Sequence, residues 1–296
     1  MKAVRFHEYG DPGVLRYEDV GRPVPGAGQV RIRVAATSFN PVDGTIRGGF
    51  MQGPIPVVLP HTPGIDVAGT VDALGEGVTG LETGAEVVGF LPMDKPGAAA
   101  EYVLAPAEAL TPAPKSVPLA DAAALPLVGL TAHQALFDHG KVTAGQRVLV
   151  NGARGAVGGY AVQLAENAGA HVIAVDRTTG DLSTVVTEPV DVVLNLAPIT
   201  PEQPAALLAL IHSGGVLVNT TVWMPAPSDE ERGVRGIDLF VRSDAGQLAQ
   251  LVTLVDRGEL RIDVAERVSL ADLPALHARA AEGGVHGKVV VVPESV

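Results

Sequence analysis

The strongest constraint in this sequence is a glycine-rich turn between a short apolar run and an alanine-rich segment. Residues 147–150 (RVLV) predict a buried strand, and residues 158–168 predict a helix. Three glycines, three positions apart, lie between or at the start of these elements: Gly152, Gly155 and Gly158. Glycine allows a tight turn and lets the backbone approach a pyrophosphate, whose charge the helix N-terminus meets. The strand–turn–helix context therefore favours a dinucleotide site over an ordinary tight turn.

The chain beyond this turn alternates apolar strands with helices. Further strands are expected at residues 171–175, 191–196 and 215–219, with a helix over residues 204–211. Because such uniformly apolar strands are typical of sheets covered on both faces, this half of the chain predicts a doubly wound parallel sheet, the Rossmann class of α/β fold.

The first ~115 residues have a different texture. Glycine and proline separate short apolar runs, such as residues 30–35 and 85–90, which is typical of a β-rich domain. An alanine- and leucine-rich stretch follows from about residue 119, and residues 287–292 again predict a strand. With 296 residues, the chain is long enough for two domains.

Charge and composition narrow the partners. The net charge of −12 opposes attachment to nucleic acid or to an anionic membrane. The absence of cysteine excludes disulfides and thiolate metal ligands. The N-terminus lacks the apolar region of a signal peptide, and no stretch approaches the roughly 20 apolar residues of a membrane span. We therefore expect a soluble, cytoplasmic protein that acts on a small molecule.

The second strand of the predicted Rossmann domain ends at Asp176, eighteen positions after Gly158. An acidic residue there binds the adenosine ribose hydroxyls in Rossmann folds, which favours NADH. Arg177 and Arg154 could instead hold a 2′-phosphate, so NADPH stays open, and Arg177 could equally belong to a solvated loop.

Several motifs together extend along nearly the whole chain, and no single one would suffice. They are residues 40–43 (NPVD), 46–49 (IRGG), 63–71 (PGIDVAGTV), 100–103 (AEYV), 123–132 (AALPLVGLTA), the glycine turn and residues 287–290 (GKVV). With this set the chain resembles the medium-chain dehydrogenase/reductase superfamily, and within it the zinc-free quinone oxidoreductase branch.

The resemblance implies a GroES-like, β-rich substrate domain at residues 1–118 and 263–296, built around a Rossmann domain at residues 119–262. It also implies hydride transfer from NAD(P)H, usually NADPH, to a quinone or conjugated enone, and a homodimer joined along the Rossmann sheets. In the zinc-dependent branch a histidine follows the glycine of the second motif, and Ile65 stands there in this chain. Since cysteine ligands are also missing, we expect no metal.

The resemblance further implies roles for individual residues. Asn40 and Asp43 are expected to be catalytic, although both belong to dipeptides that also form turns. Residues expected near the substrate are Phe50, Met51, His61, Trp223 and Phe240. Residues expected at the cofactor are Thr131, Gly152, Ala153, Arg154, Gly155, Ala156, Val157, Gly158, Asp176, Arg177, Leu196, Ala197, Asn219, Thr220, Thr221, Phe240, Val241 and Arg242.

Two departures from the family pattern bear on this function. Relatives often place a proton-donating tyrosine where this chain has Met51, which weakens an enoyl thioester reductase interpretation and suits a quinone. Between Arg177 and Asp191 the chain is too short for the usual helix and strand, so the adenine side of the site is altered. Enoyl thioester reduction, and a noncatalytic cofactor-binding scaffold on the same fold, are the alternatives.

Overall fold

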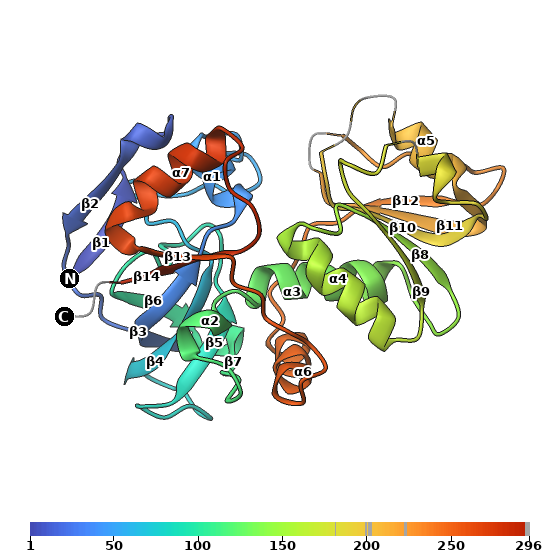
Figure 1. Ribbon diagram of the computed structural model, residues 1–296. Coiled ribbons are helices and arrows are strands. Elements are labelled where there is room, and N and C mark those ends of the chain that lie inside the picture. The colour runs from blue at the N-terminus through green and yellow to red at the C-terminus, as the bar shows by residue number, and fades with distance from the viewer. Residues whose placement is uncertain (181, 199, 201–202, 222–223, 294–296) are drawn as a thin grey trace. The chain divides into compact units, whose positions relative to one another are not determined.

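A computed structural model describes residues 1–180, 182–198, 200, 203–221 and 224–293. The chain divides into two compact units, each visible in Figure 1. Unit 1 combines residues Met1–Leu127 with residues Ser243–Val296, and unit 2 is the continuous segment Val128–Arg242. Unit 1 is therefore built from both ends of the chain.

Unit 1 is organised around an antiparallel sheet whose strands run in the order β13-β14-β3-β4-β5-β7, with β6 also paired to β3. A separate antiparallel pair, β1 and β2, lies beside it. The strands are β1 (Lys2–Phe6), β2 (Leu15–Asp19), β3 (Gln29–Ser38), β4 (Asp66–Leu74), β5 (Glu86–Phe90), β6 (Tyr102–Pro106), β7 (Leu110–Pro112), β13 (Glu266–Ser269) and β14 (Val289–Val292). Only β13 and β14 pair in parallel. The C-terminal strands thus complete the sheet that the N-terminal strands begin.

Helices cover parts of this sheet. They are α1 (Pro41–Arg47), α2 (Leu119–Ala122), the start of α3 (Pro126–His133), α6 (Ala245–Asp256) and α7 (Leu273–Ala281), with short 3-10 helices at Pro12–Val14, Ala107–Ala109 and Leu270–Asp272. Helix α2 packs against β3 and β4, and α6 packs against β5 and β7. For that reason residues 119–127 and 243–262 lie in unit 1, whereas the sequence analysis placed them in the Rossmann domain.

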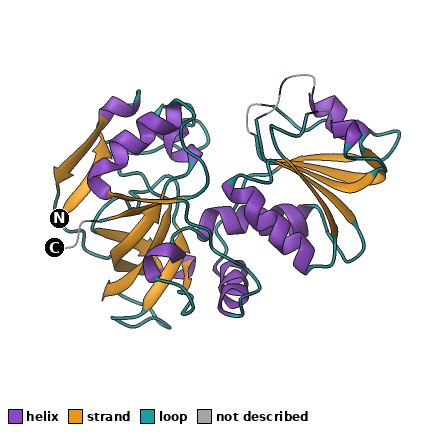
Figure 2. Cartoon of the chain, viewed as in Figure 1, coloured by secondary structure: helices purple, strands orange, loops and turns teal. Residues whose placement is uncertain are grey.

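Unit 2 contains a five-stranded sheet of parallel strands in the order β12-β11-β10-β8-β9 (Figure 2). Its strands are β8 (Arg147–Asn151), β9 (His171–Val175), β10 (Val190–Asn195), β11 (Ile211–Asn219) and β12 (Arg235–Asp238). Its helices are the rest of α3, a π-helix at Gln134–His139, α4 (Ala156–Asn167) and α5 (Gln203–Ala209). This is the Rossmann-like parallel sheet that the strand–helix alternation predicts.

The sheet of unit 2 ends at β9, because the described residues between β9 and β10 contain a single 3-10 helix, at Leu182–Thr184, and no strand. Val186 from this segment packs into the core with Val175 and Val190. The connection therefore returns directly to β10 without adding another strand beyond β9.

Candidate functional site

The glycine turn joins β8 to α4 in unit 2 as the sequence predicts. Gly152 has φ +95°, a left-handed conformation that favours glycine. A Cβ added to Gly158 would lie 2.2 Å from the backbone oxygen of Gly152, so no larger residue fits there. The N-cap of α4 is Gly155, and no side chain caps the first amides of the helix. These features fit a site that receives a pyrophosphate against the helix N-terminus.

Asp176 follows β9 and faces the turn, but its carboxylate is already engaged. Thr178 donates to Oδ1 from its backbone N–H, at 2.7 Å, and from its hydroxyl, at 2.6 Å. Arg154 Nε lies 2.7 Å from Oδ2. The hydrogen bonds from Thr178, with the charges of Arg154 and Arg177, lower the pKa of Asp176 below its usual value. Arg154 itself is 81% exposed, so the outward face of this cluster is cationic.

The carboxyl ends of the strands in unit 2 carry a ladder of side-chain amides. Asn151 donates to Asn195, and Asn195 donates to Asn219, each at 2.8 Å. Asn219 in turn donates to Asp238 at 2.8 Å and accepts from the Thr221 hydroxyl at 2.6 Å. The four amide and acid residues occupy matching register positions on adjacent strands. This ladder holds the carboxyl ends of the strands in place, and ligands bind beyond these ends in open α/β folds.

The sequence analysis expected Asn219 at the cofactor, but its amide is buried in this ladder. No role was expected for Asn151, Asn195 or Asp238, although an asparagine at the end of each of three apolar strands is a signal present in the sequence.

The other residues expected at the cofactor lie around the same unit. Leu196 and Ala197 follow β10, and a Cβ on Gly152 would contact Ala197 at 3.1 Å. Thr220 donates to the backbone oxygen of Asn195. Thr131 is buried within α3. The Arg242 guanidinium lies 3.0 Å from Asp138, beside Val241 and the 58% exposed Phe240.

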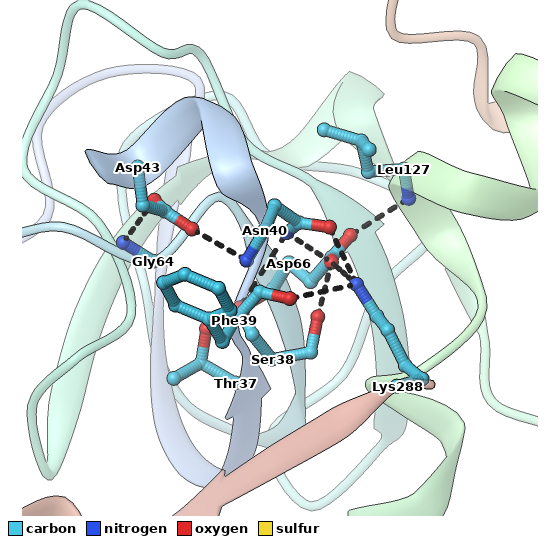
Figure 3. Close-up of polar contacts among 9 residues, drawn as sticks. All are labelled: Thr37, Ser38, Phe39, Asn40, Asp43, Gly64, Asp66, Leu127 and Lys288. Carbon is cyan, nitrogen blue, oxygen red and sulfur yellow. Dashed lines mark hydrogen bonds and ion pairs between the residues drawn. The ribbon is translucent and has the colours of Figure 1, made fainter. Parts of the chain in front are cut away.

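A cluster of buried polar side chains lies in unit 1, and Figure 3 shows its contacts. The Asp66 carboxylate accepts from the Ser38 hydroxyl, from Asn40 Nδ2 at 2.9 Å and from the backbone N–H of Leu127 at 2.7 Å. Lys288, from just before β14, donates to Asn40 Oδ1 at 2.5 Å and lies 3.3 Å from the same carboxylate. Its ammonium is buried, which lowers the pKa of Lys288. One contact network therefore joins segments that are far apart in sequence.

Asn40 and Asp43 begin α1 as a capping box. Asp43 accepts from the backbone N–H groups of Asn40 and Gly64, each at 3.0 Å. Burial raises the pKa of Asp43 to about 7. Both side chains are buried and bonded within the unit, and the catalytic role expected for them stays a prediction.

Asp66 and Lys288 belong to motifs quoted from the sequence, but the sequence analysis gave them no role. Each is a charged residue at the start of an apolar strand. A charged residue in a strand that is covered on both faces needs a buried partner. The presence of one acidic and one basic residue in such positions could have predicted that Asp66 and Lys288 pair with each other.

The residues expected at the substrate differ in their exposure to solvent. Phe50 is 70% exposed, whereas Met51 is buried in the core with Ile46 and Ile55. Trp223 lies outside the described residues. His61 is buried against Phe6, and burial lowers its pKa to about 4, so the ring is neutral.

His61 and Asp43 both line a small hollow of about 10 Å³ in unit 1. A larger pocket of about 440 Å³ shares Thr62, Lys95 and Gly97 with that hollow and has walls of mostly apolar residues. Its volume is within the range of small-molecule sites. The sequence analysis did not foresee this pocket, because its walls come from four separated stretches of chain.

Among the described residues, no group of three or more His, Cys, Asp or Glu side chains could hold a metal ion. Within the same part of the chain, no helix is long and apolar enough to cross a membrane.

An antiparallel GroES-like unit and a parallel unit with a dinucleotide-type glycine turn define a two-domain dehydrogenase architecture. Family models agree, since the alcohol dehydrogenase GroES-like domain matches residues 26–115 and the zinc-binding dehydrogenase domain matches residues 168–291. The chloroplastic quinone oxidoreductase QR1 of Triphysaria versicolor is 30% identical over 99% of this chain and 98% of that protein. The chain belongs to the medium-chain dehydrogenase/reductase superfamily, in its quinone oxidoreductase branch.

Solved structures give the same result over the full length. The quinone oxidoreductase from Coxiella burnetii has a TM-score of 0.89 and 28% identity, covering 99% of both chains. A mycobacterial protein solved with NADPH has a TM-score of 0.83 and 28% identity, covering 99% of this chain and 100% of that one. Alignments with other curated quinone oxidoreductases, such as those of rat and human at 38% and 37% identity, cover about 60% of this chain and span about half of their length. Family membership implies an oxidoreductase that binds NAD(P)H and acts on a small molecule.

Proposed function

We propose that the chain transfers hydride from NAD(P)H to a quinone or a conjugated enone without zinc. The observation that carries this proposal is the buried Lys288 ammonium, which occupies the polar cluster around Asn40 and Asp66. A Zn²⁺ ion bound by Asn40 would lie within a few ångströms of this cation, and the two charges would repel each other in a buried site. Ile65, in the place of a zinc-ligating histidine, offers no donor atom.

A site without a Lewis acid favours substrates that are already electrophilic. An alcohol or simple ketone needs polarisation before hydride can leave or arrive, whereas a quinone or enone is already electrophilic. NAD(P)H supplies the hydride, and the quinone takes this hydride and one proton to become the hydroquinone. Because Met51 is buried in the core where relatives carry a tyrosine, we assign the proton to solvent.

The protein's own contribution is binding and orientation. The glycine turn receives the pyrophosphate, and the amide ladder holds the strand ends in register behind it. The 440 Å³ pocket, with its largely apolar walls, suits an uncharged substrate or its apolar tail.

We further propose that NADPH is preferred over NADH. Free Asp176 would accept the ribose hydroxyls of NADH, but here its carboxylate oxygens are engaged by Thr178 and Arg154. The exposed guanidinium groups of Arg154 and Arg177 offer charge-assisted hydrogen bonds to a 2′-phosphate instead.

Direct titration with NADPH and NADH, followed by turnover with quinones, enones and a 2-enoyl thioester, tests this function. We expect tighter binding of NADPH and turnover of the quinones and enones, with little of the thioester. If neither cofactor binds at millimolar concentration, that result contradicts hydride transfer and favours a scaffold role.

The Arg154→Ser substitution should reduce the NADPH preference by about tenfold, which corresponds to roughly 1.4 kcal/mol. Arg16→Ser, on β2, is the matched control. Asp176→Ser should increase the preference, because it releases Arg154.

We also propose that the chain works as a cytoplasmic homodimer, as its resemblance to the family implies. Strand β12 has a free edge in the sheet of unit 2 and is the candidate surface for joining two sheets. Light scattering would detect the dimer, and cell fractionation would test the location. A monomer at micromolar concentration would contradict the proposed homodimer.

A further inference from the structure

Arg47, the last residue of α1, is a buried cation without a counter-ion. Its side chain is only 7% exposed, and Nε and Nη1 are fully buried with no hydrogen-bond partner among the described residues. No carboxylate in the described part of the chain lies within ion-pair distance of it, whereas Arg31 and Arg267, both more exposed, pair with Asp72 and Asp121. Burial lowers the pKa of Arg47, and the attraction of the exposed Asp11 is the smaller opposing effect.

His277 lies on α7 and has a second unpartnered buried nitrogen. Helix α7 packs against α1, and the His277 ring is held edge-on against Phe39 with centroids 5.0 Å apart. The residue is 3% exposed, and Nδ1 is buried with no partner among the described residues. Burial, together with the positive charge of Arg47, lowers the pKa of His277 to about 3. The ring is therefore neutral, and its Nδ1–H can act as a donor.

These two groups cost the fold free energy as they stand. An uncompensated buried cation is among the most destabilising features a protein can contain, and an orphaned imidazole nitrogen adds to it. The chain carries 33 acidic residues, yet none pairs with Arg47 among the described residues. A bound group with negative charge and several acceptor lone pairs would satisfy all three nitrogens at once.

We propose that Arg47 and His277 form a binding site for a small inorganic anion, of the chloride or phosphate kind, inside unit 1. The anion accepts hydrogen bonds from Arg47 Nε and Nη1 and from His277 Nδ1–H. The site is separate from the glycine turn, which lies in unit 2. It lies at the opposite end of α1 from the Asn40–Asp43 capping box.

The test measures the melting temperature of the full chain in chloride and in phosphate. Ionic strength is kept constant with a bulky organic anion, so that general screening does not change. Because a ligand that binds only the native state raises its stability, we expect a rise in Tm that saturates with one of the two anions, and the more effective anion identifies the site's preference. A Tm independent of both anions overturns the proposal and leaves buried water as the partner of these nitrogens.

Two substitutions assign the effect to these residues. Arg47→Met should abolish the saturable rise and, in buffer without either anion, should cost little stability because it removes an uncompensated charge. Arg16→Met, at an exposed arginine on β2, should retain the wild-type response. Equal anion responses in the Arg47 and Arg16 variants overturn the proposal.

A second measurement tests the site directly in the wild-type protein. Chloride NMR of the wild-type protein should show line broadening that phosphate competes away and that His277→Phe weakens. No broadening beyond that of a protein with similar surface charge, together with no phosphate effect on Tm, also overturns the proposal.

Discussion

Replacing Lys288 by methionine tests how the buried polar cluster holds unit 1 together. Removing one partner of a buried ion pair costs about 3–5 kcal/mol, because the other charge stays buried. Asp66 keeps the donors of Ser38, Asn40 and Leu127, and its 3.3 Å distance from the Lys288 ammonium is long, so the low end of this range applies. We therefore expect Lys288→Met to lower the free energy of unfolding by about 3 kcal/mol, or Tm by roughly 6–12 °C for a unit of this size.

Urea unfolding of four proteins measures this coupling: the wild type, Lys288→Met, Asp66→Asn and the double variant. The double variant should lose clearly less than the sum of the two single losses, because each single change leaves one group of the pair buried alone. Lys95→Met, at a side chain that is 68% exposed, is the matched control and should change stability by less than about 0.5 kcal/mol. A loss below about 1 kcal/mol for Lys288→Met, or strictly additive losses, would refute the reasoning.

Three further predictions concern single groups. Burial raises the pKa of Asp43 to about 7, so the native state holds the proton more tightly than the unfolded chain does, and this contribution to stability falls as pH rises from about 4 to 7. Urea unfolding across that pH range should show this fall in the wild type and not in Asp43→Asn. The same dependence of stability on pH in both proteins would contradict the assignment. Gly158→Ala would place a Cβ 2.2 Å from the Gly152 oxygen and should weaken NADPH binding by at least about tenfold, whereas Gly159→Ala, with no atom within 4 Å, should bind normally in the same titration. Asn195→Ala leaves the amides of Asn151 and Asn219 without their shared partner and should cost about 1–3 kcal/mol in urea unfolding, and a loss within error of zero would show that the ladder adds no stability.

The sequence predicted the elements with strong local signals. Strands β8, β9 and β10 and helix α4 lie within two residues of their expected positions, because apolar periodicity and the glycine turn determine them locally. The division between the two units was harder to place. Helix α6 lies in unit 1 because it packs on β5 and β7, and nothing in its own sequence identifies the strands that it covers.

The site illustrates the same limit. The turn geometry of Gly152 and Gly158, and the place of Asp176 directly after β9, could be predicted because they depend on neighbours along the chain. Whether Asp176 is free or bonded depends on the Arg154 side chain across the turn, which no spacing specifies. The partners of Lys288 are more than 200 residues away in sequence, so a single sequence shows the charge but not what neutralises it.

The polar cluster also has a consequence for the order of events during synthesis. Unit 2 is one continuous segment, so its translation is complete before residues 243–293 are made. Asp66 is translated more than 200 residues before its cation, Lys288. Until then the sheet of unit 1 lacks β13 and β14 and would have to bury Asp66 without Lys288. The first 127 residues therefore lack β13, β14 and the ammonium of Lys288 throughout the translation of unit 2.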